Sequence, residues 1–514
     1  MGQGPWRWVG GAVALVMAVA CSNSQSITSS PDSGAIDPGD AGIPDAGLPD
    51  AGQPDAGQPD AGATFGGPGP WPKDNVTYGA AQGLDLPYPG IVGFTTDETQ
   101  NQWAATNSAL YLMRPGDTTF RRYGAGDGLH LQSNPVRYCD SNFAGGDQSC
   151  PIFGGAADPG IREIVGGGPN EVFVGYFSNH DWTSEDDGTW NSPFRHQGKI
   201  DRVRLKPDGT LDVVRFDLVA SNTVMYWHNR DAYRMLYDHF IHKHELYVGA
   251  EHGVDKISPD KWFEPTNQNW PYTEYREWMS DHLHPHTCKD EVCTGGQQDT
   301  QMMGGFAALA IDPFDGDLWA GSYYSAGKIT YTEDAVGWWN RGGAQAFAYT
   351  FGTSWCGSAG QVKIWNNQVG NWVMTPCAPG QFGGPPVFPV PSPGDVMYIN
   401  AVTVTPDHKS WWSSPTYGIA SFDGRQFTYF SPAQAGTTST VTDLVALPDG
   451  RLAVATQNDG LMIWNPDTGA HTAFRAGSGL PHNQVNRLEL DLMVNPPALH
   501  VSTALGATTL RMFP

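Results

Sequence analysis

Apolar positions recur along the chain in pairs of short strands. Each copy has an apolar strand, a polar turn and a second strand that ends near a small residue. The clearest copy is VTDLVALPDGRLAVATQNDGLMIW at 441–464. Six further copies follow the same pattern, at 91–106, 161–176, 237–250, 306–322, 399–422 and 485–503. This periodicity predicts an all-β fold that is built from one repeated unit.

The small residue late in the second strand marks the length of the repeat. It falls at Ala105, Gly175, Gly249, Gly321, Ser413, Ala455 and Ser502. Successive spacings are 70, 74, 72, 92, 42 and 47 residues, and the last two match a bare four-stranded propeller blade. We therefore predict a seven-bladed β-propeller of four-stranded blades, closed by a strand from residues 64–90. An elongated β-solenoid or two sandwiches is the alternative, but sandwiches do not repeat at blade length.

The four longer spacings predict insertions into the propeller, which we assign to residues 64–514. The insertions lie near 123–160, 177–198, 263–304 and 340–397. Three of them hold near pairs of cysteines, namely Cys139 with Cys150, Cys288 with Cys293, and Cys356 with Cys377. Local disulfides within each pair are the simplest expectation, although other connectivities remain open. A zinc site is disfavoured, because no CxxC pair is present and export favours oxidation.

The first twenty residues have the layout of a secretory signal, with Arg7 before an apolar run that ends at Ala20. Small residues directly before Cys21 resemble the lipobox of bacterial lipoproteins. This resemblance implies cleavage after residue 20 and acylation of Cys21. Removing Cys21 from the seven cysteines leaves an even number in an exported protein. Ordinary signal cleavage nearby is the alternative. Ser22 follows the cysteine instead of Asp, which favours the outer membrane over the inner one.

Residues 21–63 are expected to form a disordered acidic tether after the lipidated cysteine. The segment repeats PDAG at a period of five and has no basic or aromatic residue. Regular prolines and like charges keep such a chain extended, and it has nothing with which to form a core. A calcium-binding repeat is less consistent with the spacing, since such loops need several oxygens at one turn.

Composition narrows the function classes. The chain has 53 acidic and 29 basic side chains and a formal net charge of -24, which excludes a surface suited to nucleic acid. Its 63 Gly and 40 Pro residues are too many for a helical bundle.

Two segments resemble the linker motif of the two-component-regulator propeller family, which is streptogramin-lyase-like in fold. They are FRAGSGLPHNQVNRLELD at 474–491 and RYGAGDGLHLQSNPVR at 122–137. In that motif a Gly-Leu turn precedes an Asn and a Val that opens the next blade. The matching residues are Gly479, Leu480, Asn483 and Val485, and Gly128, Leu129, Asn134 and Val136. The resemblance implies the propeller fold and a ligand-sensing or binding role. No catalytic residue carries over, and no attached histidine kinase is expected.

One insertion carries candidate metal ligands. His282, His284 and His286 alternate in DHLHPHTC, so an extended segment would place them on one face and allow them to hold one divalent metal ion. Propeller lyases and lactonases hold metals and bases at the central mouth, and this is the basis of an enzyme hypothesis. Solvated loop histidines beside Pro285 are the alternative. No catalytic residue is assigned, and enzyme activity is disfavoured.

The same insertion is rich in aromatic residues, which could stack on sugar rings or anchor a protein partner. The candidate binding aromatics are Trp262, Trp270, Tyr272, Tyr275 and Trp278. Packing between loops is the alternative. We therefore expect a monomeric, lipid-anchored envelope protein, periplasmic or surface-exposed, that binds a protein or a glycan and no nucleic acid. A metal-assisted lyase or hydrolase and a purely structural component are the two alternative functions.

Overall fold

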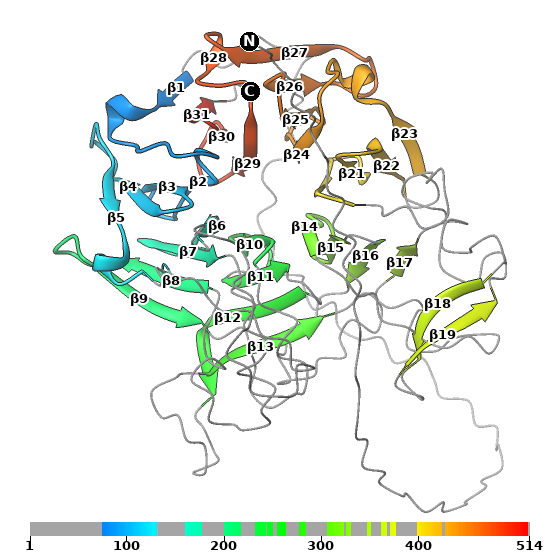
Figure 1. Ribbon diagram of the computed structural model, residues 1–514, viewed down its shortest axis with the longest axis horizontal. Coiled ribbons are helices and arrows are strands. Elements are labelled where there is room, and N and C mark those ends of the chain that lie inside the picture. The colour runs from blue at the N-terminus through cyan, green and yellow to red at the C-terminus, as the bar shows by residue number, and fades with distance from the viewer. Residues whose placement is uncertain are drawn as a thin grey trace, which may run out of the picture.

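The computed structural model confirms the propeller. It describes residues 75–129, 131, 160–176, 200–216, 232–242, 244–249, 254–263, 277–283, 306–322, 325–329, 347–350, 361–366, 371–376, 398–423 and 427–511. The expected signal peptide, Cys21, the expected tether and the six cysteines that are predicted to pair lie outside these ranges. Figure 1 shows seven blades around one ring, and each blade is a four-stranded antiparallel meander, with the short β28 added to blade 6. The described helices are short 3-10 turns, and none of them could cross a membrane.

The first four blades follow one another along the chain. Blade 1 holds β2 (Gly93–Thr96), β3 (Gln102–Thr106), β4 (Ala109–Met113) and β5 (Arg121–Tyr123). Blade 2 holds β6 (Ile161–Gly166), β7 (Glu171–Tyr176), β8 (Ile200–Leu205) and β9 (Leu211–Phe216). Blade 3 holds β10 (Arg234–Asp238), β11 (Glu245–Gly249), β12 (Val254–Phe263) and β13 (Glu277–Leu283). Blade 4 holds β14 (Phe306–Ile311), β15 (Leu318–Ser322), β16 (Ser325–Ile329) and β17 (Phe347–Thr350).

The last three blades complete the ring. Blade 5 holds β20 (Ala401–Val404), β21 (Ser410–Ser414), β22 (Gly418–Phe422) and β23 (Phe427–Phe430). Blade 6 holds β24 (Val441–Ala446), β25 (Leu452–Thr456), β26 (Leu461–Trp464), β27 (His471–Ala476) and the short β28 (Gly479–Leu480). Blade 7 holds β29 (Val485–Asp491), β30 (Ala498–Thr503), β31 (Gly506–Arg511) and, as its outer strand, β1 (Asn75–Tyr78). The expected closing strand from residues 64–90 is therefore β1, which lies beside β31 in Figure 1.

Two of the segments assigned as insertions contain strands. The segment near 263–304 holds β13, the fourth strand of blade 3. The segment near 340–397 holds β17 and a separate hairpin of β18 (Gln361–Asn366) and β19 (Asn371–Pro376).

The described residues form seven apolar clusters, one between each pair of neighbouring blades. The small residues that marked the repeat lie where these contacts are closest. A Cβ atom on Gly175 would lie 2.7 Å from the Ala232 Cβ, and one on Gly321 would lie 2.5 Å from the Ile399 Cγ2. Both distances are shorter than packed side chains tolerate. The small residues thus allow each blade to pack against the next.

The linker motif has a clear structural role in the copy at 474–491. Gly479 adopts a φ of 100°, which an L side chain rarely tolerates, and Leu480 is buried. The Asn483 Oδ1 accepts a hydrogen bond from the Ala476 N–H at 2.7 Å, and Val485 opens blade 7. In the copy at 122–137, Gly128 also has a positive φ and Leu129 is buried, while Asn134 and Val136 lie outside the described residues.

The antiparallel meander gives the ring two distinct faces. The turn face carries the connections between the first and second and between the third and fourth strand of each blade. The entry face carries the other connections, including those that join successive blades. The described turn residues 239–242 and 244 of blade 3 and the end of β12 at Phe263 therefore lie at the turn face, whereas β13 ends at the entry face.

Candidate functional site

The register pairs two of the candidate binding aromatics. Trp262 on β12 lies directly opposite Trp278 on β13, just beyond an irregularity in the pairing between Ser258 and Trp262. Both residues stand at the turn-face ends of their strands. Trp270, Tyr272 and Tyr275 lie outside the described residues, within the connection that joins these two strands.

The candidate metal ligands are only partly described. His282 lies on β13 opposite Asp255, and His284 and His286 lie outside the described residues. Within the described ranges, no group of three or more His, Cys, Asp or Glu side chains is placed to hold a metal ion. The metal hypothesis for these histidines stays a prediction.

The other histidines of blade 3 lie at the opposite end of the blade from His282. His242 lies 2.8 Å from the Gly316 carbonyl oxygen through its Nε2, and the His244 Nδ1 lies 2.8 Å from the Tyr237 hydroxyl. His239 lies 3.4 Å from Glu98 of blade 1. Burial lowers the pKa of His239 and raises the pKa of Tyr237, so both side chains favour their neutral forms.

The centre of the ring holds four charged side chains, which we call the charge ring: Glu163, Arg234, Asp443 and Arg487. They come from the innermost strands of blades 2, 3, 6 and 7. Arg234 lies 3.6 Å from Glu163 and 3.2 Å from Asp443. Arg487 lies 3.1 Å from Glu163 and 4.0 Å from Asp443. Each cation thus contacts both anions, and the four charges close a cycle across the axis.

The repeat explains why these four side chains meet. Each of them pairs in register with the small residue of its blade, so all four lie at one level of the ring. At the same level, blades 1, 4 and 5 have Gly93, Ala308 and Ala401. At this level three of the seven blades thus contribute small residues, and the other four contribute charged ones.

Burial sets the protonation behaviour of the charge ring. It raises the pKa of Glu163, although both arginines oppose the shift. Burial, and then the neighbouring Arg234, lowers the pKa of Arg487. Burial also disfavours the charged form of Arg234, but Asp443 and Glu163 outweigh it and raise the pKa of that guanidinium. The charges are therefore held by one another in an enclosed place.

A single carboxyl group lies two residues further along β29. Glu489 accepts a hydrogen bond from the Thr95 hydroxyl, which in turn accepts one from the Gly166 N–H at 2.8 Å. The register places Val165, Leu236 and Val445 at the same level of their own innermost strands. Burial raises the pKa of Glu489 to about 8, against the hydrogen bond from Thr95. This group can take up or release a proton near neutral pH.

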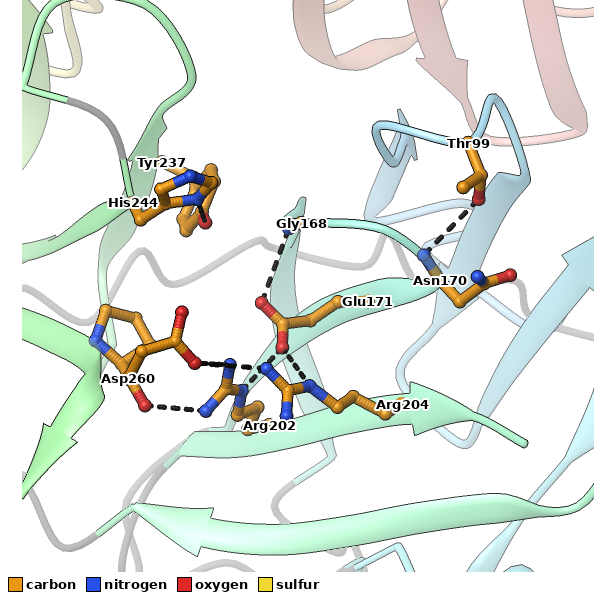
Figure 2. Close-up of polar contacts among 10 residues, drawn as sticks. Thr99, Gly168, Asn170, Glu171, Arg202, Arg204, Tyr237, His244 and Asp260 are labelled. Atoms are coloured by element: carbon orange, nitrogen blue, oxygen red, sulfur yellow. Dashed lines mark hydrogen bonds and ion pairs between the residues drawn. The ribbon is translucent and has the colours of Figure 1, made fainter.

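A second polar network lies between blades 2 and 3 (Figure 2). Glu171 is buried and accepts hydrogen bonds from the Nε atoms of Arg202 and Arg204. Arg202 also donates to the Pro259 carbonyl oxygen at 2.6 Å, and both arginines donate to Asp260. Pro259 and Asp260 lie within the irregular stretch of β12 that precedes Trp262. The network therefore fixes the backbone that leads to the Trp262–Trp278 pair.

Comparison with known proteins gives similarity in fold only. No protein-family model and no curated protein matches the chain. Among solved structures, virginiamycin B lyase from Staphylococcus aureus is 8% identical, with a TM-score of 0.42 over 86% of this chain and 100% of that one. A streptogramin B lyase is 8% identical, with a TM-score of 0.43 over 86% and 98%. A chain of a mitotic checkpoint complex is 10% identical, with a TM-score of 0.40 over 86% and 92%.

Replacing Asp443 with Asn is expected to destabilise the propeller by about 3 kcal/mol or more, because Arg234 and Arg487 then share one buried anion. Urea-induced unfolding of both proteins measures the difference. Asp407→Asn is the matched control, since Asp407 is half exposed and pairs with Lys409 at the surface. Its expected cost is below about 1 kcal/mol. Equal losses in the two variants would show that the charge ring is not a special contributor to stability.

Replacing Glu489 with Gln is expected to flatten the dependence of stability on pH. The folded pKa of Glu489 lies above its unfolded value, so its contribution is complete below about pH 4.5 and is lost as pH rises towards about 8. Gln still accepts the hydrogen bond from Thr95. The variant should match the parent near pH 4.5 and exceed it by a few kcal/mol at pH 8. Urea unfolding across this pH range measures the free energy of unfolding, with Asp85→Asn at an exposed site as control. If the parent and the Glu489 variant show the same dependence of stability on pH, the raised pKa of Glu489 is wrong.

Proposed function

We propose that this protein is a cell-envelope lipoprotein whose propeller binds a protein partner or a glycan. The observation that carries the proposal is the Trp262–Trp278 pair on the turn face of blade 3. Opposed aromatic residues at the end of a strand pair suit stacking on a sugar ring or insertion into a partner surface.

The position of this pair supports a role in binding rather than a role in covering the edge of a blade. β12 has ten residues and continues past Ser258, whereas its neighbour β11 has five and pairs only with the first part of β12. The network of Glu171, Arg202 and Arg204 ties the irregular stretch of β12 to blade 2. A binding element that is fixed in advance loses less conformational entropy when a ligand arrives.

The envelope location rests on the amino-terminal sequence. Small residues before Cys21 suit lipidation, and the acidic PDAG segment suits a spacer between membrane and propeller. The described chain begins at β1 on the outer edge of blade 7 (Figure 1). The register places Asn75 opposite Leu510, at the turn-face end of blade 7, so a tether would join the ring across from the turns of blades 3 and 4.

Replacing Trp262 and Trp278 together with Ser is expected to lower affinity for the partner or glycan at least about tenfold, since anchor aromatics carry most of the binding energy. The measurement is binding of the full chain to a panel of envelope glycans and purified envelope proteins. The matched control is Trp365→Ser with Trp372→Ser, because these residues are also directly opposed, on the separate hairpin of β18 and β19. Unchanged affinities in the first variant, with its thermal unfolding preserved, would refute the role of this pair.

Lipidation at Cys21 predicts that the intact mature protein carries acyl chains and partitions with membranes. Mass spectrometry of protein expressed with its full amino terminus measures the added mass. Cys21→Ala should lack that mass and appear in the soluble fraction. An unmodified Cys21 in the parent protein would overturn the membrane assignment without affecting the binding proposal.

A further inference from the structure

Among the described residues, the turn face of blades 3 and 4 exposes three large apolar side chains. Phe240 and Ile241 lie in the turn after β10 and are 52% and 41% exposed, and Phe314 lies in the turn after β14 and is 45% exposed. Large apolar side chains that gather on a surface mark interaction sites, whereas single ones are common. We call these three residues the apolar patch.

Contacts between the turns make the patch continuous. The His242 Nε2 lies 2.8 Å from the Gly316 carbonyl oxygen, which joins the turns of blades 3 and 4. A Cβ on Gly316 would lie 3.2 Å from the Ile241 Cγ2, so Ile241 packs on this turn. Phe314 stacks on His408 of blade 5, with ring centroids 3.4 Å apart. One surface therefore runs over three neighbouring blades.

Hydrogen bonds hold the patch in a fixed shape. The Asp238 carboxylate accepts from the backbone N–H groups of Phe240, Ile241 and His242 at 2.9, 2.8 and 2.6 Å. Asp312 accepts from the Phe314 N–H at 3.1 Å. The apolar side chains are thus presented by ordered turns, and docking on them costs little ordering of the backbone.

Carboxylates outnumber the cations among the described residues of the three turns, and of these carboxylates Asp238 and Asp312 are buried. The described residues of its three turns carry Asp238, Asp312, Asp315, Asp317 and Asp407, against Lys409 in the turns and Lys328 on β16. Lys328 is shared among Asp312, Asp315 and Asp317. Asp315 and Asp407 remain about half exposed. A ligand with positive charges around an apolar centre complements this surface.

We propose that the apolar patch docks a basic polypeptide segment that carries apolar side chains. The patch offers two phenyl rings and an aliphatic group, while the nearest carboxylates, Asp238 and Asp312, are occupied by backbone N–H groups. This arrangement favours apolar side chains over a sugar, which needs polar groups beside its ring. The proposal rests on the proposed binding role and assigns a partner class to a second surface on the same face.

The test uses the full chain with Cys21→Ala and three fluorescent peptides. The first alternates Leu and Lys, the second replaces Lys with Glu, and the third replaces Leu with Ser. Fluorescence anisotropy at about 0.15 M salt measures binding, because long-range attraction to the net charge is largely screened there. The Leu-Lys peptide should bind, and the other two should bind at least about tenfold more weakly.

Two variants locate the binding. The patch variant combines Phe240→Ser, Ile241→Ser and Phe314→Ser, and it should bind the Leu-Lys peptide at least about tenfold more weakly. Leu505→Ser with Tyr429→Ser is the control, since these exposed apolar residues lie on the entry-face turn of blade 7 and on outer strand β23. Thermal unfolding of each variant verifies that the fold is kept.

Each outcome decides between the two proposals. Equal binding to the parent and the patch variant, or equal binding of all three peptides, would overturn the patch as a docking site. Loss of glycan or partner binding only in the Trp262 and Trp278 variant, without any Leu-Lys binding, would keep the proposed function and reject the patch. If the patch variant abolishes Leu-Lys binding and the Trp262 and Trp278 variant changes binding of no ligand, the patch is kept and the role of the tryptophan pair is rejected.

Discussion

The closed cycle of charges at the axis is the constraint on which the ring depends. Four charged side chains from blades 2, 3, 6 and 7 share one level, and each of them faces both opposite charges of the cycle. Arg234 reaches Asp443 across the axis, and Arg487 reaches Glu163 past blade 1, which has Gly93 at this level. Blades that are far apart in sequence are therefore positioned by this cycle of ion pairs as well as by packing between neighbouring blades.

Closure between blades 7 and 1 uses a different set of interactions. The backbone ladder of β1 and β31 supplies the outer strand, and Tyr78 packs edge-on against Phe94 of blade 1. Nearer the axis, the Asn486 amide donates to the carbonyl oxygens of Pro89 and Ile91 at 2.9 Å. Thr96 donates to Asp491 at 2.8 Å. The seam is thus polar near the axis and apolar further out, which fixes the register of the last blade against the first.

The repeat alone was enough to predict the number of blades and the closing strand, because small residues are needed wherever blades crowd together. The charge ring was not predicted, although Glu163, Arg234, Asp443 and Arg487 occupy a position where the other copies have Gly or Ala. A charge at that position is the signal that could have revealed it, but which anion meets which cation depends on distances across the axis. β13 lies in a segment that the long repeat spacing assigns to an insertion, and its sequence EWMSDHL does not alternate regularly. The patch was also missed, since Phe240, Ile241 and Phe314 come together only through turns of separate blades.

The pairing of β1 gives the ring a mechanical weak point. Four residue pairs join β1 to β31, and of the four residues of β1 only Tyr78 is buried. In a propeller anchored through residues that precede β1, tension from a bound partner would reach this short ladder before any other strand. β1 would peel from its exposed end at Asn75 while the inner strands of blade 7 stayed in place. The pairing of β1 with β31 would thus be the first to break under tension, and it could re-form when the tension is released.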